Sequence, residues 1–162
     1  MATITFKENP VELNGSLPAV GDKAPDFTLV GADLQEKSLS DFPGTKILTI
    51  NPSYDTGICQ KAAVAFNQKA SEKDATVLMI SADLPFAQKR FCGAEGVNDV
   101  VPLSSFRSTF SDDYGVTMQG GPLKGLTARA VLVVGEDGVV KYSELVPEIV
   151  QEPNYDAAIE AV

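Results

Sequence analysis

The sequence contains no histidine and no tryptophan, and it has only two cysteines, Cys59 and Cys92. Without histidine, no Ser-His-Asp or Cys-His mechanism is open to this chain, and no metal site that needs imidazole ligands. Two cysteines are also too few for a structural zinc site built from thiolates. The catalytic chemistry that remains is that of carboxylates, of lysines, or of a cysteine activated without imidazole.

Basic residues are scarce, and arginine is the scarcest of them. The 13 lysines and arginines face 22 aspartates and glutamates, so the net charge of the chain is −9. Arginine occurs only at Arg90, Arg107 and Arg129. This balance argues against a surface that follows a phosphate backbone, and we expect no nucleic-acid partner.

Long hydrophobic runs are missing as well. No stretch approaches the roughly 20 apolar residues of a membrane-spanning helix, so we expect no membrane partner. The N-terminus lacks the basic start and apolar core of a secretory signal, which predicts a cytoplasmic protein. A stable disulfide is not the default in that compartment, so the cysteines are expected to serve redox chemistry or packing.

The chain shows no internal repeat and no linker rich in proline, glycine or serine, so residues 1–162 are expected to form one domain. Alternating residues around Asn9-Pro10 predict an N-terminal β-hairpin, and Asp137-Gly138 predicts a second hairpin. The other expected elements are strands at 46–51, 76–81, 100–103, 128–134 and 140–145, and helices at 58–70, 85–92, 107–114 and 154–162. This order predicts an α/β fold with a mostly parallel central sheet and an antiparallel edge.

Cys59 is expected in the first turn of the helix that follows the strand at 46–51. Unpaired backbone N–H groups and the positive end of the helix dipole stabilise a thiolate at such a place. Thr56 can direct its hydroxyl to the same spot, and Pro52 can screen the sulfur from water. The alternative interpretation is that Cys59 is a small buried apolar residue of the core.

Cys92 is expected at the end of a short helix, beside Gly93 and Gly96. It is either an inert buried thiol or the partner that condenses with an oxidised Cys59, since it is the only other thiol in the chain. The neighbouring glycines make a segment that could unwind and bring the two sulfurs to disulfide distance.

Arg129 stands at the start of the most apolar strand. A guanidinium in that position is costly unless it meets an anion. It serves either as the partner of a structural carboxylate, or as the group that holds the Cys59 thiolate and polarises an oxygen substrate.

Four segments together resemble the thiol peroxidases, the atypical two-cysteine group of the peroxiredoxin family. They are NPSYDTGIC at 51–59, SADLPFAQKRFCGAEG at 81–96, LTARA at 126–130 and QEPNY at 151–155. The resemblance covers nearly the whole chain. It implies a thioredoxin-like fold with an N-terminal hairpin, and a homodimer. It also implies that no metal, flavin or haem is needed.

The same resemblance implies the roles of individual residues. Cys59 matches the peroxidatic cysteine, whose thiolate attacks a hydroperoxide and becomes a sulfenic acid. Cys92 matches the resolving cysteine, which forms an intrachain disulfide that thioredoxin then reduces. Pro52, Thr56 and Arg129 match active-site positions of the family. The substrates implied are hydrogen peroxide and organic hydroperoxides.

The sequence departs from the family pattern at two positions. Val64 stands where similar proteins usually carry an arginine, and Tyr54 replaces a usual aliphatic residue. The missing arginine removes one positive charge from the helix of Cys59. This departure keeps an alternative function open, a peroxide-responsive redox sensor or binding protein with weak turnover. A third alternative is a domain without redox activity, whose cysteines only fill the core.

Overall fold

The computed structural model describes residues 1–70 and 72–162. A small antiparallel hairpin begins the chain, with β1 (Thr3–Phe6) paired to β2 (Asn9–Glu12). Ile4 lies opposite Val11, and both side chains are buried. The predicted N-terminal hairpin is therefore confirmed.

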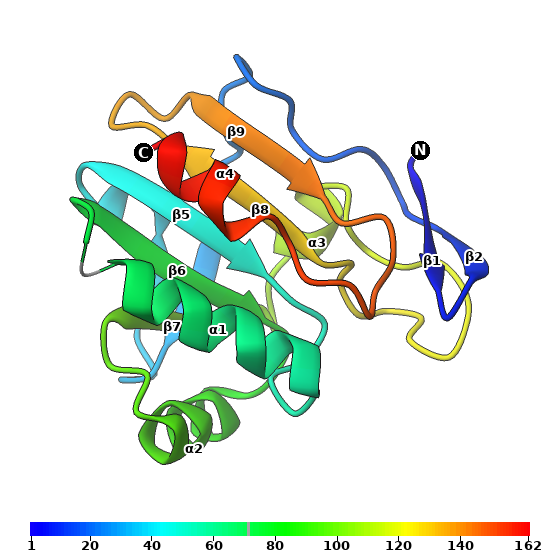
Figure 1. Cartoon of the computed structure of the whole chain (residues 1–162), viewed down its shortest axis with the longest axis horizontal. Coiled ribbons are helices and arrows are strands. Elements are labelled where there is room, and N and C mark those ends of the chain that lie inside the picture. The colour runs from blue at the N-terminus through cyan, green and yellow to red at the C-terminus, as the bar shows by residue number, and fades with distance from the viewer. Residues whose placement is uncertain (71) are drawn as a thin grey trace.

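A seven-stranded mixed sheet forms the centre of the molecule, with the order β4-β3-β7-β6-β5-β8-β9 (Figure 1). Its strands are β3 (Thr28–Gly31), β4 (Glu36–Ser38), β5 (Thr45–Ile50), β6 (Ala75–Ser81), β7 (Val100–Ser104), β8 (Ala130–Val134) and β9 (Val140–Leu145). The predicted α/β fold is confirmed, but its sheet is not mostly parallel. Only β7, β6 and β5 run parallel, and antiparallel pairs flank them on both sides. The second antiparallel flank arises because β3 and β4 form a hairpin, and β3 then pairs antiparallel with β7.

The helices are α1 (Gly57–Ala70), α2 (Pro85–Glu95), α3 (Phe110–Asp113) and α4 (Tyr155–Glu160), with a 3₁₀ turn, η1, at Leu39–Asp41. Helix α3 is shorter than the predicted 107–114. Helix α4 begins after Asn154, whose side chain caps it by accepting from the Ala157 N–H. Helix α2 continues to Glu95 and ends at Gly96, whose φ of 65° favours glycine. Among the described residues, no helix is both long and apolar enough to cross a membrane.

Side chains of the central strands alternate between two apolar clusters, one on each face of the sheet. Leu48 and Ile50 belong to the cluster that also holds Phe110 and the hairpin residue Ile4. Ile47 belongs to the other cluster, which lies under α1 and contains Cys59. This alternation follows from the two-residue period of a strand. Figure 1 shows α1 and α4 in front of the sheet and α3 behind it.

The N-terminal hairpin is tied to the segment that follows β9. The Thr5 N–H donates to the Pro147 carbonyl, and the Ile149 N–H donates to the Thr5 carbonyl. The Glu148 carboxylate accepts hydrogen bonds from the N–H groups of Glu8 at 2.8 Å and Val150 at 2.9 Å. These bonds fix the backbone around Ile149.

Stability should depend on the ionisation of Glu148. The backbone hydrogen bonds from Val150 and Glu8 lower the pKa of its carboxyl below 4.5. A lowered folded-state pKa stabilises the fold above the unfolded-state value, and this contribution is lost as the pH falls through the folded-state pKa. The urea midpoint should therefore decrease less between about pH 6 and about pH 3.5 in Glu148→Gln than in the wild type. Equal decreases in the two proteins would contradict this role.

Candidate active site

Cys59 is the third residue of α1, and its side chain is fully buried. The turn from Asn51 to Thr56 connects it to the end of β5. Local sequence accounts for this path, because Pro52 supplies no backbone N–H to continue the sheet and Gly57 opens the helix. The predicted place of Cys59, in the first turn of a helix after a buried strand, is confirmed.

Arg129 directs its guanidinium at the sulfur of Cys59. Its Nη1 lies 3.1 Å from Cys59 Sγ and donates to Asn51 Oδ1 at 2.7 Å. Its Nε and Nη2 both donate to the carbonyl of Ile149, at 3.1 and 2.7 Å. The guanidinium is thus held by two groups, the Ile149 carbonyl and the Asn51 side chain, and Nη1 also reaches the sulfur.

Arg129 is 2% exposed. None of the ion pairs found between described residues includes it, so the alternative of a structural carboxylate partner is not what the structure shows. A buried cation with no carboxylate favours an anion nearby. The sulfur of Cys59 is the group in contact that can supply this charge, as a thiolate.

An apolar cavity of about 350 Å³ adjoins the guanidinium. Its lining residues are Phe6, Pro52, Ser53, Thr56, Gly57, Ile58, Leu123, Leu126, Arg129, Ile149 and Val150. Three of the expected site residues, Pro52, Thr56 and Arg129, thus share one cavity wall. Thr56 donates its hydroxyl to the Ser53 carbonyl at 3.0 Å. Within residues 1–70 and 72–162, no hydrogen bond joins this hydroxyl to Cys59, so Thr56 holds the turn and offers the cavity its oxygen lone pairs.

Cys92 lies in the last turn of α2 and is half-buried. Burial raises the pKa of its thiol above 9.0, so the thiol is protonated at neutral pH. Cys59 and Cys92 are both free thiols, and both side chains belong to the apolar cluster under α1. The structure therefore places Pro52, Thr56 and Arg129 along one cavity and both cysteines in or against one apolar cluster, and Arg129 donates the hydrogen bond to the Cys59 sulfur.

Comparisons with known proteins agree with this geometry. The family model described as Redoxin matches residues 19–159. The chain belongs to the Redoxin family. Thiol peroxidases of Mycobacterium tuberculosis and Corynebacterium glutamicum are 54% and 51% identical to it, over 100% of this chain and 99% of each relative. A peroxiredoxin-like protein of Aquifex aeolicus, 40% identical, superposes with a TM-score of 0.91 over 99% of this chain and 95% of its own.

These similarities confirm the expected resemblance to thiol peroxidases and the thioredoxin-like peroxiredoxin fold. They also confirm, at the level of the family, the expectation of a thiol-dependent peroxidase.

Two groups of this Redoxin site were not expected from the sequence. Asn51 is fully buried and joins Arg129 to the turn after β5. A polar residue directly after a buried strand was a signal that could have indicated it. The Ile149 carbonyl accepts two hydrogen bonds from Arg129. It is a backbone group, so no residue type in the sequence could have indicated it.

Val64 faces a shallow groove on the outer side of α1. The groove is also lined by Gln60, Lys61, Glu95 and Glu152. The Cys59 sulfur has its cation in Arg129, which reaches it from β8 and not from α1. The arginine that is missing at position 64 is therefore not needed to place a positive charge at the sulfur.

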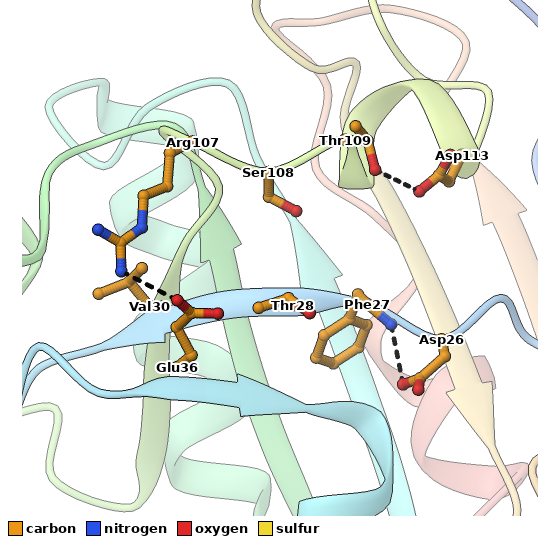
Figure 2. Close-up of a pocket in the computed structure, with 9 residues that line it drawn as sticks. All are labelled: Asp26, Phe27, Thr28, Val30, Glu36, Arg107, Ser108, Thr109 and Asp113. Atoms are coloured by element: carbon orange, nitrogen blue, oxygen red, sulfur yellow. Dashed lines mark hydrogen bonds and ion pairs between the residues drawn. The ribbon is translucent and has the colours of Figure 1, made fainter.

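A separate pocket of about 500 Å³ lies between β3 and α3, and Figure 2 shows its lining side chains. Arg107 pairs with Glu36 at 3.5 Å, and Asp113 accepts from the Thr109 hydroxyl at 2.7 Å. Asp26 accepts from the Phe27 N–H. Its nine lining residues include no cysteine and none of the residues of the apolar cavity beside Arg129, so this pocket takes no part in the chemistry of the thiols.

Proposed function

We propose that the chain reduces hydroperoxides at Cys59, resolves the product with Cys92, and is recycled by thioredoxin. The observation that carries this proposal is the 3.1 Å contact between Arg129 Nη1 and Cys59 Sγ in a buried site without histidine. A guanidinium cannot act as a base at neutral pH, but it stabilises a thiolate and the charge on a departing oxygen. The site thus stabilises both the thiolate nucleophile and the departing oxygen, as peroxide reduction requires.

In the first step the Cys59 thiolate attacks the distal oxygen of a hydroperoxide. An S–O bond forms and the O–O bond breaks, so the sulfur is oxidised by two electrons to a sulfenic acid. The departing oxygen takes up a proton and leaves as an alcohol, or as water when the substrate is hydrogen peroxide. Arg129 and the Thr56 oxygen line the cavity in which this charge develops.

In the second step Cys92 attacks the sulfenic sulfur. An S–S bond forms, and hydroxide leaves and is protonated to water. Thioredoxin, itself becoming oxidised, then reduces the intrachain disulfide by thiol exchange and returns both thiols. The half-exposed position of Cys92 supports this role, because a reductant protein needs access to one sulfur of the disulfide.

The cavity supports organic hydroperoxides as substrates besides hydrogen peroxide. Phe6, Leu123, Leu126, Ile149 and Val150 give it apolar walls next to Arg129. Burying the alkyl part of a substrate against these side chains is favourable by about 25 cal/mol per Å². An alkyl hydroperoxide can therefore gain binding energy that hydrogen peroxide cannot.

The proposal includes a homodimer in the cytoplasm. Large exposed apolar side chains support a contact surface, with Leu84 and Phe86 at the start of α2 and Phe106 after β7. Light scattering of the purified chain at micromolar concentration tests this part and should give twice the monomer mass of 17.2 kDa.

The decisive experiment mixes the reduced wild-type chain with one equivalent of hydrogen peroxide. Within seconds neither thiol should still react with an alkylating reagent, and peptide mass spectrometry should show a Cys59–Cys92 disulfide. With thioredoxin, its reductase and NADPH, peroxide should then be consumed over many turnovers. Thiols that remain intact over minutes would refute the proposal, and oxidation without turnover would favour the redox sensor.

A further inference from the structure

Tyr54 lies in the turn that precedes α1. It is 2% exposed and belongs to the same apolar cluster as Cys59 and Cys92. The family pattern leads us to expect an aliphatic residue here, which would fill space but would have neither a hydroxyl nor a ring to stack. The two additional features of tyrosine each make a specific contact.

The Tyr54 hydroxyl fixes the side chain of Asn51. Because Arg129 can only donate, the Asn51 oxygen must face Arg129, and the Asn51 amide nitrogen then faces Tyr54. That nitrogen donates to the Tyr54 hydroxyl at 2.7 Å and to Thr49 Oγ1 at 3.1 Å. Burial, the largest cause, raises the pKa of Tyr54 well above 10.0, so the hydroxyl is neutral at physiological pH.

Loss of this hydroxyl would leave one Asn51 N–H unpaired at a site that is fully buried. An unpaired buried donor is costly, so the Asn51 amide would be held less firmly in the orientation that fixes Arg129. Asn51 and the Ile149 carbonyl are the groups that aim the guanidinium at Cys59. The hydroxyl of Tyr54 is thus linked to the sulfur through two hydrogen-bonded side chains.

The Tyr54 ring makes the second contact, with the helix of Cys92. It stacks on Phe91, the residue before Cys92, with ring centroids 5.5 Å apart and an angle of 28° between planes. The Tyr54 N–H also donates at 2.7 Å to the carboxylate of Asp83, just before α2 begins. The turn before Cys59 is therefore fastened to α2 at two points.

Disulfide formation requires the Cys92 sulfur, which α2 carries, to reach the Cys59 sulfur. Both sulfurs are free, and a disulfide requires them to approach to about 2.05 Å. Gly93 weakens the helix next to Cys92 and has open space where a Cβ would lie, so close packing does not require it. Among the described residues, Gln88 Oε1 on α2 is a buried acceptor without a partner, which also makes the docked helix less stable. The stacking of Tyr54 on Phe91 stabilises α2 in its docked position against both of these effects.

We propose that Tyr54 is a positioning residue with two separable tasks. Its hydroxyl orients Arg129 for the oxidation of Cys59, and its ring holds α2 and so restrains Cys92 before the disulfide forms. This inference rests on the proposed function, because the two tasks serve successive steps of the peroxidase cycle.

Two variants separate the tasks. Tyr54→Phe keeps the ring and removes the hydroxyl, and we expect it to slow oxidation of Cys59 about fivefold while disulfide formation stays within twofold of wild type. Phe91→Leu weakens the stack, and we expect disulfide formation to accelerate about threefold while oxidation stays within twofold. Quenched-flow alkylation followed by mass spectrometry measures the two steps separately in each protein.

Tyr114→Phe is the matched control, because Tyr114 is also fully buried and its hydroxyl donates to the Pro25 carbonyl at 2.6 Å. It should leave both rates unchanged. The inference is overturned if Tyr54→Phe oxidises Cys59 at the wild-type rate or slows both steps equally. It is also overturned if Phe91→Leu forms the disulfide no faster than wild type. A wild-type chain whose thiols survive peroxide overturns the proposed function itself, which these variants do not test.

Discussion

Cys59→Ser should abolish peroxide consumption completely, whereas Cys92→Ser should retain one turnover. A serine hydroxyl beside Arg129 is not ionised at neutral pH and does not attack an O–O bond, so the first variant has no nucleophile. In the second variant Arg129 Nη1 still contacts the Cys59 sulfur, and the sulfenic acid still forms. Without Cys92 it lacks an in-chain thiol with which to condense.

The two variants differ in ways that peptide mass spectrometry detects. With one equivalent of peroxide, Cys92→Ser should accumulate Cys59 as sulfenic acid, and with excess peroxide as sulfinic acid. Turnover with thioredoxin should be lost in both proteins. Peroxide consumption by Cys59→Ser at a measurable fraction of the wild-type rate would contradict the assignment of Cys59. A wild-type rate of turnover in Cys92→Ser would contradict the assignment of Cys92.

Arg129→Lys should slow the oxidation of Cys59 by about 100-fold, as the loss of a preorganised donor at a developing charge does in other enzymes. Lysine keeps the positive charge, but a single ammonium cannot reproduce the planar fork that joins Ile149, Asn51 and Cys59. The variant therefore tests geometry and not charge alone.

Quenched-flow alkylation is the suitable measurement, because a chain without tryptophan offers no strong fluorescence change. Arg107→Lys is the matched control, since Arg107 is exposed and pairs with Glu36 outside the apolar cavity beside Arg129. It should oxidise at the wild-type rate. Circular dichroism shows whether Arg129→Lys remains folded. A folded Arg129→Lys that oxidises Cys59 within threefold of wild type would contradict the proposed role of Arg129.

Much of the fold was predictable because it depends on local pattern. Apolar runs located β5, β6 and β8, and Asp137-Gly138 located the turn between β8 and β9. The antiparallel flank of β3 and β4 was not predicted, since no local signal says which strand a hairpin will join. Pairing of β3 with β7 connects residues about 70 positions apart, and it is decided by the packing of the whole sheet.

The site was predictable where side-chain chemistry alone carries it. A contact between Cys59 and Arg129 was one of the two alternatives given for Arg129, because a buried guanidinium needs an anion and histidine is absent. The groups that orient Arg129 were not expected. The carbonyl of Ile149 and the amide of Asn51 become partners only after the end of the chain and the end of β5 come together.

The order of the chain delays the assembly of this site during synthesis. Cys59 leaves the ribosome well before Arg129, and Ile149, which holds Arg129, follows later still. The backbone around Ile149 is in turn fixed by residues made well before Cys59, through the bonds of Thr5 and Glu148. A nascent chain therefore carries Cys59 without its cation, and the thiol gains its partner only after the segment around Ile149 has been synthesised.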